Sequence, residues 1–314
     1  MNTTDNALHR AIYLTGPTAS GKTAIGVALA RLLNAEIIAM DSMTLYRGMD
    51  LGTAKPTIDE RGEIPHHLID VINPWESASV ADFRSWAIDA ATAIENRGRR
   101  VLFVGGTALY LKAMLRGLFE GPAADPVLRA ELEEEAARFG DLALHERLAQ
   151  SDPVTAARLP PADRRRVVRA LEVLTLTGRP LSSFQTDHGC AVEGVRVFAL
   201  ERRREELYGR INERVVQMFA DGLLDEVRRL QSATQPLHPV PAQGVGYREA
   251  IAHLEGRLSR DEMITATQTR TRQFAKRQGT WFRGLKECRA WPIGADADPN
   301  AVASCLADEI LRAD

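Results

Sequence analysis

The sequence predicts an α/β fold, a parallel sheet flanked by helices and interrupted by a helical insertion. Short apolar runs alternate with helical patterns over the first hundred residues, and a glycine-rich loop joins the first run to the first helix. From about residue 116 the pattern becomes wholly helical. We therefore expect a core made of residues 1–115 and 195–314, and an insertion domain made of residues 116–194.

The strands of the expected sheet are short runs rich in β-branched residues and bounded by turn residues. Such continuous apolar runs are typical of strands that are buried on both faces of a parallel sheet. A β–α–β order also places the ligand site at the carboxyl ends of the strands. The predicted strands are residues 11–15, 36–40, 101–105 and 195–200, with residues 66–72 as a further candidate.

Helical periodicity accounts for most of the remaining chain. Residues 22–34 carry apolar positions at helical spacing between the first two strands. Residues 79–98 are predicted to form a helix that Ser79 caps, with Asp82 three residues on, and that ends at Gly98. Residues 204–230 and 260–285 are also predicted to be helical, whereas the tail from about residue 292 is only weakly patterned.

The composition is that of an ordinary globular protein, with 45% hydrophobic and 26% charged residues among 314. No apolar run has the length of a membrane span, and the polar N-terminus lacks a signal core, so we expect a cytoplasmic protein. Cys190, Cys288 and Cys305 have no zinc-site spacing and are expected to be reduced structural thiols. Because the net charge is −2, a nucleic-acid partner would have to bind local basic patches.

The loop GPTASGKT at residues 16–23 has the G-x(4)-G-K-[ST] spacing of a phosphate-binding loop, so the core is predicted to be of the P-loop type. Glycines let backbone N–H groups surround phosphate oxygens, and the following helix adds positive potential at its N-terminus. Lys22 is expected to reach a terminal phosphate, and the Thr23 hydroxyl to coordinate Mg²⁺. The predicted phosphate-binding residues are Gly16, Pro17, Thr18, Ala19, Ser20, Gly21, Lys22 and Thr23.

A carboxylate is expected beside this loop. Nucleotide hydrolases usually place a magnesium-binding acid at the end of a second apolar strand, but the strand at 101–105 is followed by glycine and threonine. Asp41 instead follows the strand at 36–40, which puts it at the ligand edge of the sheet. The alternative role for an Asp-Ser pair at this position is a helix or turn cap.

The companion motifs of the loop resemble those of the tRNA dimethylallyltransferases, also called tRNA isopentenyltransferases. The resemblance covers about residues 10–285. The sequence has no C-terminal zinc-finger Cys/His set and in this respect resembles the short bacterial form of the family. The motifs, in order, are GPTASGKT (16–23), DSMTLYRGMDLGTAKP (41–56), HHLIDV (66–71), FVGGTALYL (103–111), RRVVRALEV (165–173), GVGYRE (244–249) and RQGTWFR (277–283).

This resemblance implies a magnesium-dependent prenyl transfer. A dimethylallyl group would pass from dimethylallyl diphosphate to N6 of adenosine 37, 3′ of the anticodon, in tRNAs reading codons that begin with U. The product would be N6-isopentenyladenosine. The loop would hold the diphosphate leaving group, and no ATP would be consumed. The resemblance implies catalytic roles for Asp41 as the base and for Lys22, Thr23 and Arg214 at the diphosphate, with Arg210 as the alternative to Arg214.

The resemblance also implies contacts with the tRNA anticodon stem-loop by a protein that we expect to be a monomer. Two stretches are locally basic, residues 158–169 and 270–286, and aromatic residues interrupt the second, which suits phosphate contacts and base stacking. The implied tRNA-binding residues are Asp41, Ser42, Met43, Thr44, Thr107, Arg129, Arg165, Arg166, Arg169, Gln243, Gly244, Gly246, Tyr247, Arg248, Lys276, Arg277, Gln278, Trp281 and Arg283.

Structural roles compete with these assignments. An arginine-rich helix is most often a solvated face with intrahelical ion pairs. Trp281 and Phe282 are more typical of a core than of a stacking platform, and Tyr247 with Arg248 could cap a turn. Arg165 stands where the family usually has glutamine, and adjacent His66 and His67 favour a hydrogen-bonding role over metal ligation.

Three other functions remain open from the residues alone. A prenyltransferase acting on free adenine nucleotides would not need a long basic insertion. A small-molecule kinase would use the loop for ATP and need arginines around the transferring phosphoryl group. An RNA-binding protein with an inactive loop would have no use for intact Lys22, Thr23 and Asp41.

Overall fold

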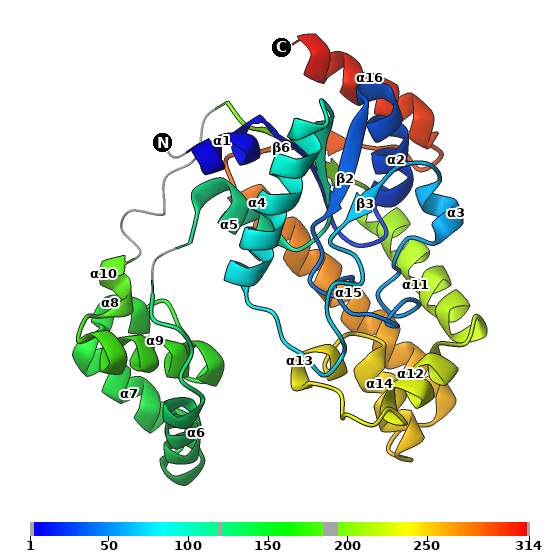
Figure 1. Ribbon diagram of the computed structural model, residues 1–314. Coiled ribbons are helices and arrows are strands. Elements are labelled where there is room, and N and C mark those ends of the chain that lie inside the picture. The colour runs from blue at the N-terminus through cyan, green and yellow to red at the C-terminus, as the bar shows by residue number, and fades with distance from the viewer. Residues whose placement is uncertain (1–2, 119–120, 185–193, 313–314) are drawn as a thin grey trace. The chain divides into compact units, whose positions relative to one another are not determined.

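The computed structural model describes residues 3–118, 121–184 and 194–312 (Figure 1). The chain forms two compact units: residues 1–115 with 191–314, and residues 116–190. In the described parts of the chain, no helix combines the length and the apolar character needed to cross a membrane. Cys190 lies outside the described residues, whereas Cys288 is half-buried and Cys305 is exposed.

A parallel sheet of six strands, counted over the described residues, organises the larger unit. Every strand pair is parallel, which confirms the predicted α/β class. The spatial order is β3–β2–β4–β1–β5–β6. The strands are β1 (Ile12–Thr15), β2 (Ala35–Ala39), β3 (His66–His67), β4 (Arg100–Val104), β5 (Arg196–Glu201) and β6 (Cys288–Pro292).

Two details of the sheet differ from the prediction. The expected strand at 66–72 is limited to β3, and Ile72 instead makes an isolated parallel bridge to Tyr46. The edge strand β6 was not predicted, because its sequence CRAWP is partly exposed and has no continuous apolar run. It forms a strand because its backbone pairs with β5, not because its own residues favour one.

Both faces of the sheet are covered by helices, as the apolar strands require. Ile12 and Leu14 of β1 pack in the cluster formed with α2 (Lys22–Leu33) and α16 (Pro299–Arg312). Tyr13 points the other way, into a larger cluster with residues of α4 (Val80–Asn96), α5 (Ala108–Arg116) and other helices. Side chains alternate across a strand, so this partition follows directly from a sheet buried on both faces.

The predicted helices of the larger unit are confirmed, with one break. Ser79 and Asp82 form a reciprocal capping box at the start of α4. The helical stretch at 204–230 is two helices, because Gly222 adopts φ +104° between them. The other helices are α1 (Thr3–Arg10), α3 (Ile58–Arg61), α11 (Arg204–Ala220), α12 (Leu223–Gln231), α13 (Pro239–Ala242), α14 (Tyr247–Leu254) and α15 (Arg260–Gly284).

The smaller unit is helical throughout its described residues and has its own apolar core. Leu132, Leu148, Val167 and Leu171 belong to this core, which no strand enters within residues 121–184. Aspartate caps begin its two longest helices, with Asp125 and Asp163 accepting from backbone N–H groups. The helices are α6 (Pro126–Phe139), α7 (Asp141–Ser151), α8 (Pro153–Ala156), α9 (Arg164–Thr177) and α10 (Leu181–Phe184).

Candidate active site

The phosphate-binding loop connects β1 to α2 and requires unusual backbone conformations. Gly16, Ala19 and Gly21 have φ values of +144°, +64° and +97°. A Cβ atom at Gly16 would lie 2.7 Å from the Leu200 carbonyl oxygen, so only glycine fits there. Ala19 has a Cβ and adopts the left-handed region all the same, which the surrounding contacts must enforce.

Side chains from distant elements hold this loop. The Arg210 Nε donates to the Ala19 carbonyl at 2.9 Å, and the Arg202 Nε donates to the Ser20 carbonyl at 3.0 Å. Lys22 closes the loop from within, because its Nζ donates to the Pro17 carbonyl at 2.7 Å. The loop is therefore shaped by the protein before any ligand arrives.

A cavity of about 580 Å³ opens beside the loop at the carboxyl ends of the strands. This is the edge at which the sheet topology predicts a ligand. Its apolar wall includes Ile37, Ala39, Ile69 and Val104. The ionisable and hydroxyl side chains that line it are those of Thr18, Lys22, Thr23, Asp41, Thr44, Thr53, Glu60, His66, Arg210, Glu213 and Arg214.

Asp41 lies just beyond the end of β2 and faces this cavity. Its Oδ1 accepts from the Met43 N–H at 2.9 Å, so the carboxylate also caps a turn. Burial raises the pKa of Asp41, and the bond from Met43 and the charge of Lys22 oppose that shift. The two roles considered for Asp41 are compatible, because one carboxylate oxygen is enough for the turn.

Lys22 and Arg214 are among the cations that share the cavity with Asp41. Burial lowers the pKa of Lys22 to about 8, with Asp41 raising it and Arg214 lowering it. Burial likewise lowers the pKa of Arg214, while Glu60 raises it and Arg210 lowers it. A bound anion would stabilise the charged forms of desolvated cations that repel one another, so this end of the cavity suits a phosphate-bearing ligand.

The residues at the loop also fit a magnesium ion of the kind held with phosphate. Thr23 lies in the first turn of α2 and lines the cavity with Asp41. Over the described residues, no group of three or more His, Cys, Asp or Glu side chains could hold a metal by itself. Mg²⁺ commonly takes one or two protein ligands, water and phosphate oxygens, which is the set that a hydroxyl beside a phosphate loop provides.

The implied tRNA-binding residues of the larger unit separate into exposed and buried groups. Tyr247 is 1% exposed, and its hydroxyl donates to Glu226 at 2.5 Å. Burial raises the pKa of Tyr247 most, and the charge of Glu226 raises it further. Gln278, Thr44 and Gly246 are also buried. The exposed residues are Gln243, Arg248, Lys276, Arg277, Trp281 and Arg283, while Ser42, Met43, Thr107 and Gly244 are half-buried.

Trp281 corrects one expectation. It is 47% exposed on α15, whereas Phe282 beside it is 3% exposed and belongs to the core. A tryptophan in the core was therefore the wrong expectation for Trp281 and the right one for Phe282. On a helix two adjacent residues point in directions about 100° apart, so one can pack while the other faces solvent.

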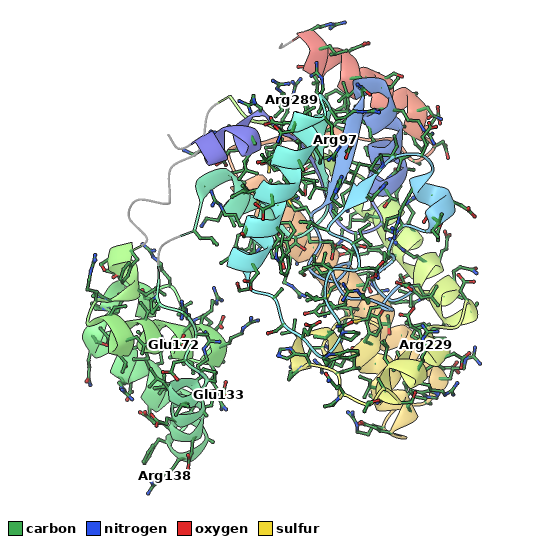
Figure 2. The ribbon with its side chains drawn as sticks, in the orientation of Figure 1. Arg97, Glu133, Arg138, Glu172, Arg229 and Arg289 are labelled. Atoms are coloured by element: carbon green, nitrogen blue, oxygen red, sulfur yellow. The ribbon has the colours of Figure 1, made fainter. Side chains whose placement is uncertain are left out.

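The arginines of the smaller unit are largely paired within it. Glu172, labelled in Figure 2, lies in the helical smaller unit. It is 0% exposed and accepts from Arg129 and Arg169 as well as from the Asp125 N–H. Arg166 pairs with Asp163, and Arg165 is exposed. Arg166 with the N-cap Asp163 and Arg169 with Glu172 are the short-range pairs expected along one helix. Arg129 instead reaches Glu172 from α6 and so joins two helices of the unit.

Sequence reasoning missed Arg202 and assigned no chemistry to Glu60 or Glu213. Arg202 follows β5 directly, so a cation at a strand end beside the loop was the available signal. His66 and His67 have the hydrogen-bonding roles that were expected. The His66 Nδ1 lies 2.8 Å from the Ile64 carbonyl oxygen, and the His67 Nε2 lies 2.7 Å from a Glu36 carboxylate oxygen.

Comparisons with known proteins agree with the motif resemblance. The family model described as IPP transferase matches residues 44–285. A tRNA dimethylallyltransferase of Geobacter metallireducens is 50% identical over 276 residues, covering 87% of this chain and 89% of that protein. A second, from Pelotomaculum thermopropionicum, is 44% identical over 305 residues, covering 96% of this chain and 97% of the relative.

Solved structures extend the likeness to the fold. The full-length tRNA isopentenylpyrophosphate transferase of Bacillus halodurans has a TM-score of 0.71 and 39% identity, covering 97% of this chain and 96% of its own. A eukaryotic dimethylallyltransferase acting on tRNA has a TM-score of 0.81 and 26% identity, covering 96% of this chain and 79% of its own.

Proposed function

The chain belongs to the IPP transferase family and is a tRNA prenyltransferase, and from this premise we propose that it transfers a dimethylallyl group from dimethylallyl diphosphate to N6 of adenosine 37. The acceptor tRNAs read codons that begin with U, and the product is N6-isopentenyladenosine. The observation that carries the proposal is one cavity that joins the phosphate-binding loop, Asp41 and Arg214 to an apolar wall.

The donor fits the two ends of this cavity. The backbone of the phosphate loop, Lys22 and Arg214 bind and stabilise the negative charge that grows on the diphosphate as the allylic carbon–oxygen bond breaks. The wall of Ile37, Ala39, Ile69 and Val104 suits a five-carbon apolar tail. Thr23 would hold Mg²⁺ beside the diphosphate, and the ion would further neutralise the charge of the leaving group. Arg210 is the less favoured diphosphate ligand, because its Nε is engaged by the Ala19 carbonyl.

Asp41 supplies the base. The N6 amine of adenine is a weak nucleophile because its lone pair is delocalised into the ring. As N6 bonds to the allylic carbon, one amine proton passes to the Asp41 carboxylate and diphosphate departs. Burial raises the pKa of Asp41, which makes its carboxylate a better proton acceptor than an exposed one.

The acceptor is bound as an anticodon stem-loop. On α15, exposed Lys276, Arg277 and Arg283 with Trp281 offer phosphate contacts and a stacking surface. In the smaller unit, exposed Arg165 of α9 offers a further phosphate contact. The target base must leave its stack to reach a cavity, so base flipping accompanies binding. The enzyme acts as a cytoplasmic monomer.

The test is transfer of label from radiolabelled dimethylallyl diphosphate, with Mg²⁺, to an unmodified tRNA and separately to AMP. A transcript with guanosine at position 37 serves as the acceptor control, and Lys22→Met as the protein control. Label in tRNA that requires adenosine 37 and Lys22 supports the proposal. Label only in AMP would replace the acceptor, and ATP turnover without transfer would favour a kinase.

A further inference from the structure

Gln278 lies on the buried face of α15, although its neighbours in sequence are exposed and basic. Only 5% of Gln278 is accessible, whereas Lys276, Arg277 and Trp281 face solvent. A buried carboxamide needs partners for both its donor and its acceptor. The identity of those partners therefore indicates what this side chain does.

The two partners belong to two different loops of the cavity edge. The Gln278 Oε1 accepts from the Thr18 N–H of the phosphate loop at 2.8 Å, and the Gln278 Nε2 donates to the Gly106 carbonyl at 2.8 Å. The assignment of oxygen and nitrogen is forced, because an amide N–H can only donate and a carbonyl can only accept. One planar group thus joins the loop after β1 to the loop after β4.

The second loop is shaped to receive this amide. A Cβ atom at Gly106 would lie 2.5 Å from the Gln278 Nε2, so a side chain at 106 would displace the carboxamide. The next residue, Thr107, accepts from the Ser42 N–H through its Oγ1 at 3.1 Å. The contacts therefore run from Thr18 through Gln278 and the residues 106–107 to Ser42, the neighbour of Asp41.

Resting on the proposed function, we infer that Gln278 is a positioning residue that holds the diphosphate loop at a fixed separation from the loop that supports Asp41. The Thr18 N–H is engaged by this amide, and both the oxygen and the nitrogen of the amide are bonded to backbone in a side chain that is buried. Placement within about 0.5 Å decides whether reacting groups are productive, so a link between the leaving-group side and the base side controls the rate. This role differs from the tRNA contact that the motif resemblance implies for Gln278.

The test replaces Gln278 by methionine, which is unbranched and of similar length but lacks the amide. Binding of inorganic diphosphate with Mg²⁺ is measured by calorimetry, tRNA binding by filter retention, and prenyl transfer by single turnover at saturating substrates. We expect Gln278→Met to weaken diphosphate about 10-fold and to slow transfer roughly 10- to 100-fold. The tRNA Kd should stay within about 3-fold, since the amide faces the protein.

Gln273→Met is the matched control, because Gln273 is exposed on the same helix. It should leave the diphosphate Kd and the saturated rate within about 2-fold. Gly106→Ala is a second route to the same contact, and it carries the test if Gln278→Met does not fold. Because both changes break one contact, the double variant should be slowed little more than the slower single variant.

The outcomes separate this inference from the proposed function. Weaker tRNA binding by Gln278→Met with an unchanged saturated rate would make Gln278 an RNA contact and overturn its positioning role. A lower Tm with unchanged diphosphate binding and rate would leave it a purely structural residue and also overturn that role. If the parent protein neither binds diphosphate nor transfers the prenyl group, the proposed function fails instead.

Discussion

The cavity of the larger unit and the core of the smaller unit treat buried charge in opposite ways. Glu172 in the smaller unit is saturated by Arg129, Arg169 and a backbone N–H. Burial alone would raise the pKa of Glu172, but these partners hold it below its ordinary value. In the cavity, burial raises the pKa of Asp41 and lowers that of Lys22. Charge that the fold has fully compensated stabilises the fold, whereas charge that is only partly compensated at a cavity is available to a ligand.

The largest effect on the rate of transfer should come from removing the carboxylate of Asp41. Asp41→Ala should slow single-turnover prenyl transfer by about 10²-fold or more while leaving tRNA affinity within a few-fold, because it removes the base rather than a binding surface. In the parent, the rate should fall as the pH drops through the raised pKa of Asp41. Asp89→Ala, at an exposed position of α4, is the control. A normal rate for Asp41→Ala would remove Asp41 from the mechanism.

The carboxylate of Glu172 should matter for the stability of the fold instead of for the rate. Glu172→Ala should destabilise the smaller unit by about 3 kcal/mol, because Arg129 and Arg169 lose their shared partner. Urea unfolding of the full chain measures this change, with exposed Glu133→Ala (Figure 2) expected within about 0.5 kcal/mol of the parent. The folded pKa of Glu172 is depressed, so its contribution is present at neutral pH and is lost as the pH falls through that pKa. Equal unfolding of the two variants would contradict the structural role.

A pH titration of diphosphate binding tests whether burial lowers the pKa of Lys22. Because burial lowers its pKa to about 8, Lys22 loses its charge as the pH rises through that value. The Kd for inorganic diphosphate should then rise by up to about 10-fold per pH unit above 8. Lys22→Arg should lose this inflection, and its curve also accounts for the titration of diphosphate itself. Identical pH profiles for the two proteins would mean that Lys22 does not titrate in this range.

The smallest effects should distinguish exposed arginines of the two units. Arg277 is exposed on α15, and its guanidinium carbon lies 6.0 Å from the centroid of the Phe274 ring. Arg166 is instead paired with Asp163. Arg277→Ala should weaken tRNA binding and lower the salt slope by about 1, and Arg166→Ala should change both less. The measurement is the tRNA Kd against salt concentration. The reverse order would mean that tRNA displaces Asp163 from Arg166.

Local signals account for most of the fold and for the centre of the site. The glycines and lysine of the phosphate loop, the capping pair Ser79 and Asp82, and the strands β1, β2, β4 and β5 were predictable because each depends on neighbours within a few residues. Asp41 was found by its position after a strand. The edge strand β6 was missed, because its regularity comes from pairing with β5 rather than from its own residues.

By itself, the sequence determined the strands β1, β2, β4 and β5, the phosphate-binding loop and the acid beside it, since strand ends in a parallel sheet meet at one edge whatever surrounds them. Only the tertiary structure decided that Gln278 and Tyr247 face inward and that Arg129 pairs with Glu172. A side chain's burial depends on which distant element packs against its helix face. For Gln278 those partners lie 260 and 172 residues away in the chain, beyond the reach of any local pattern.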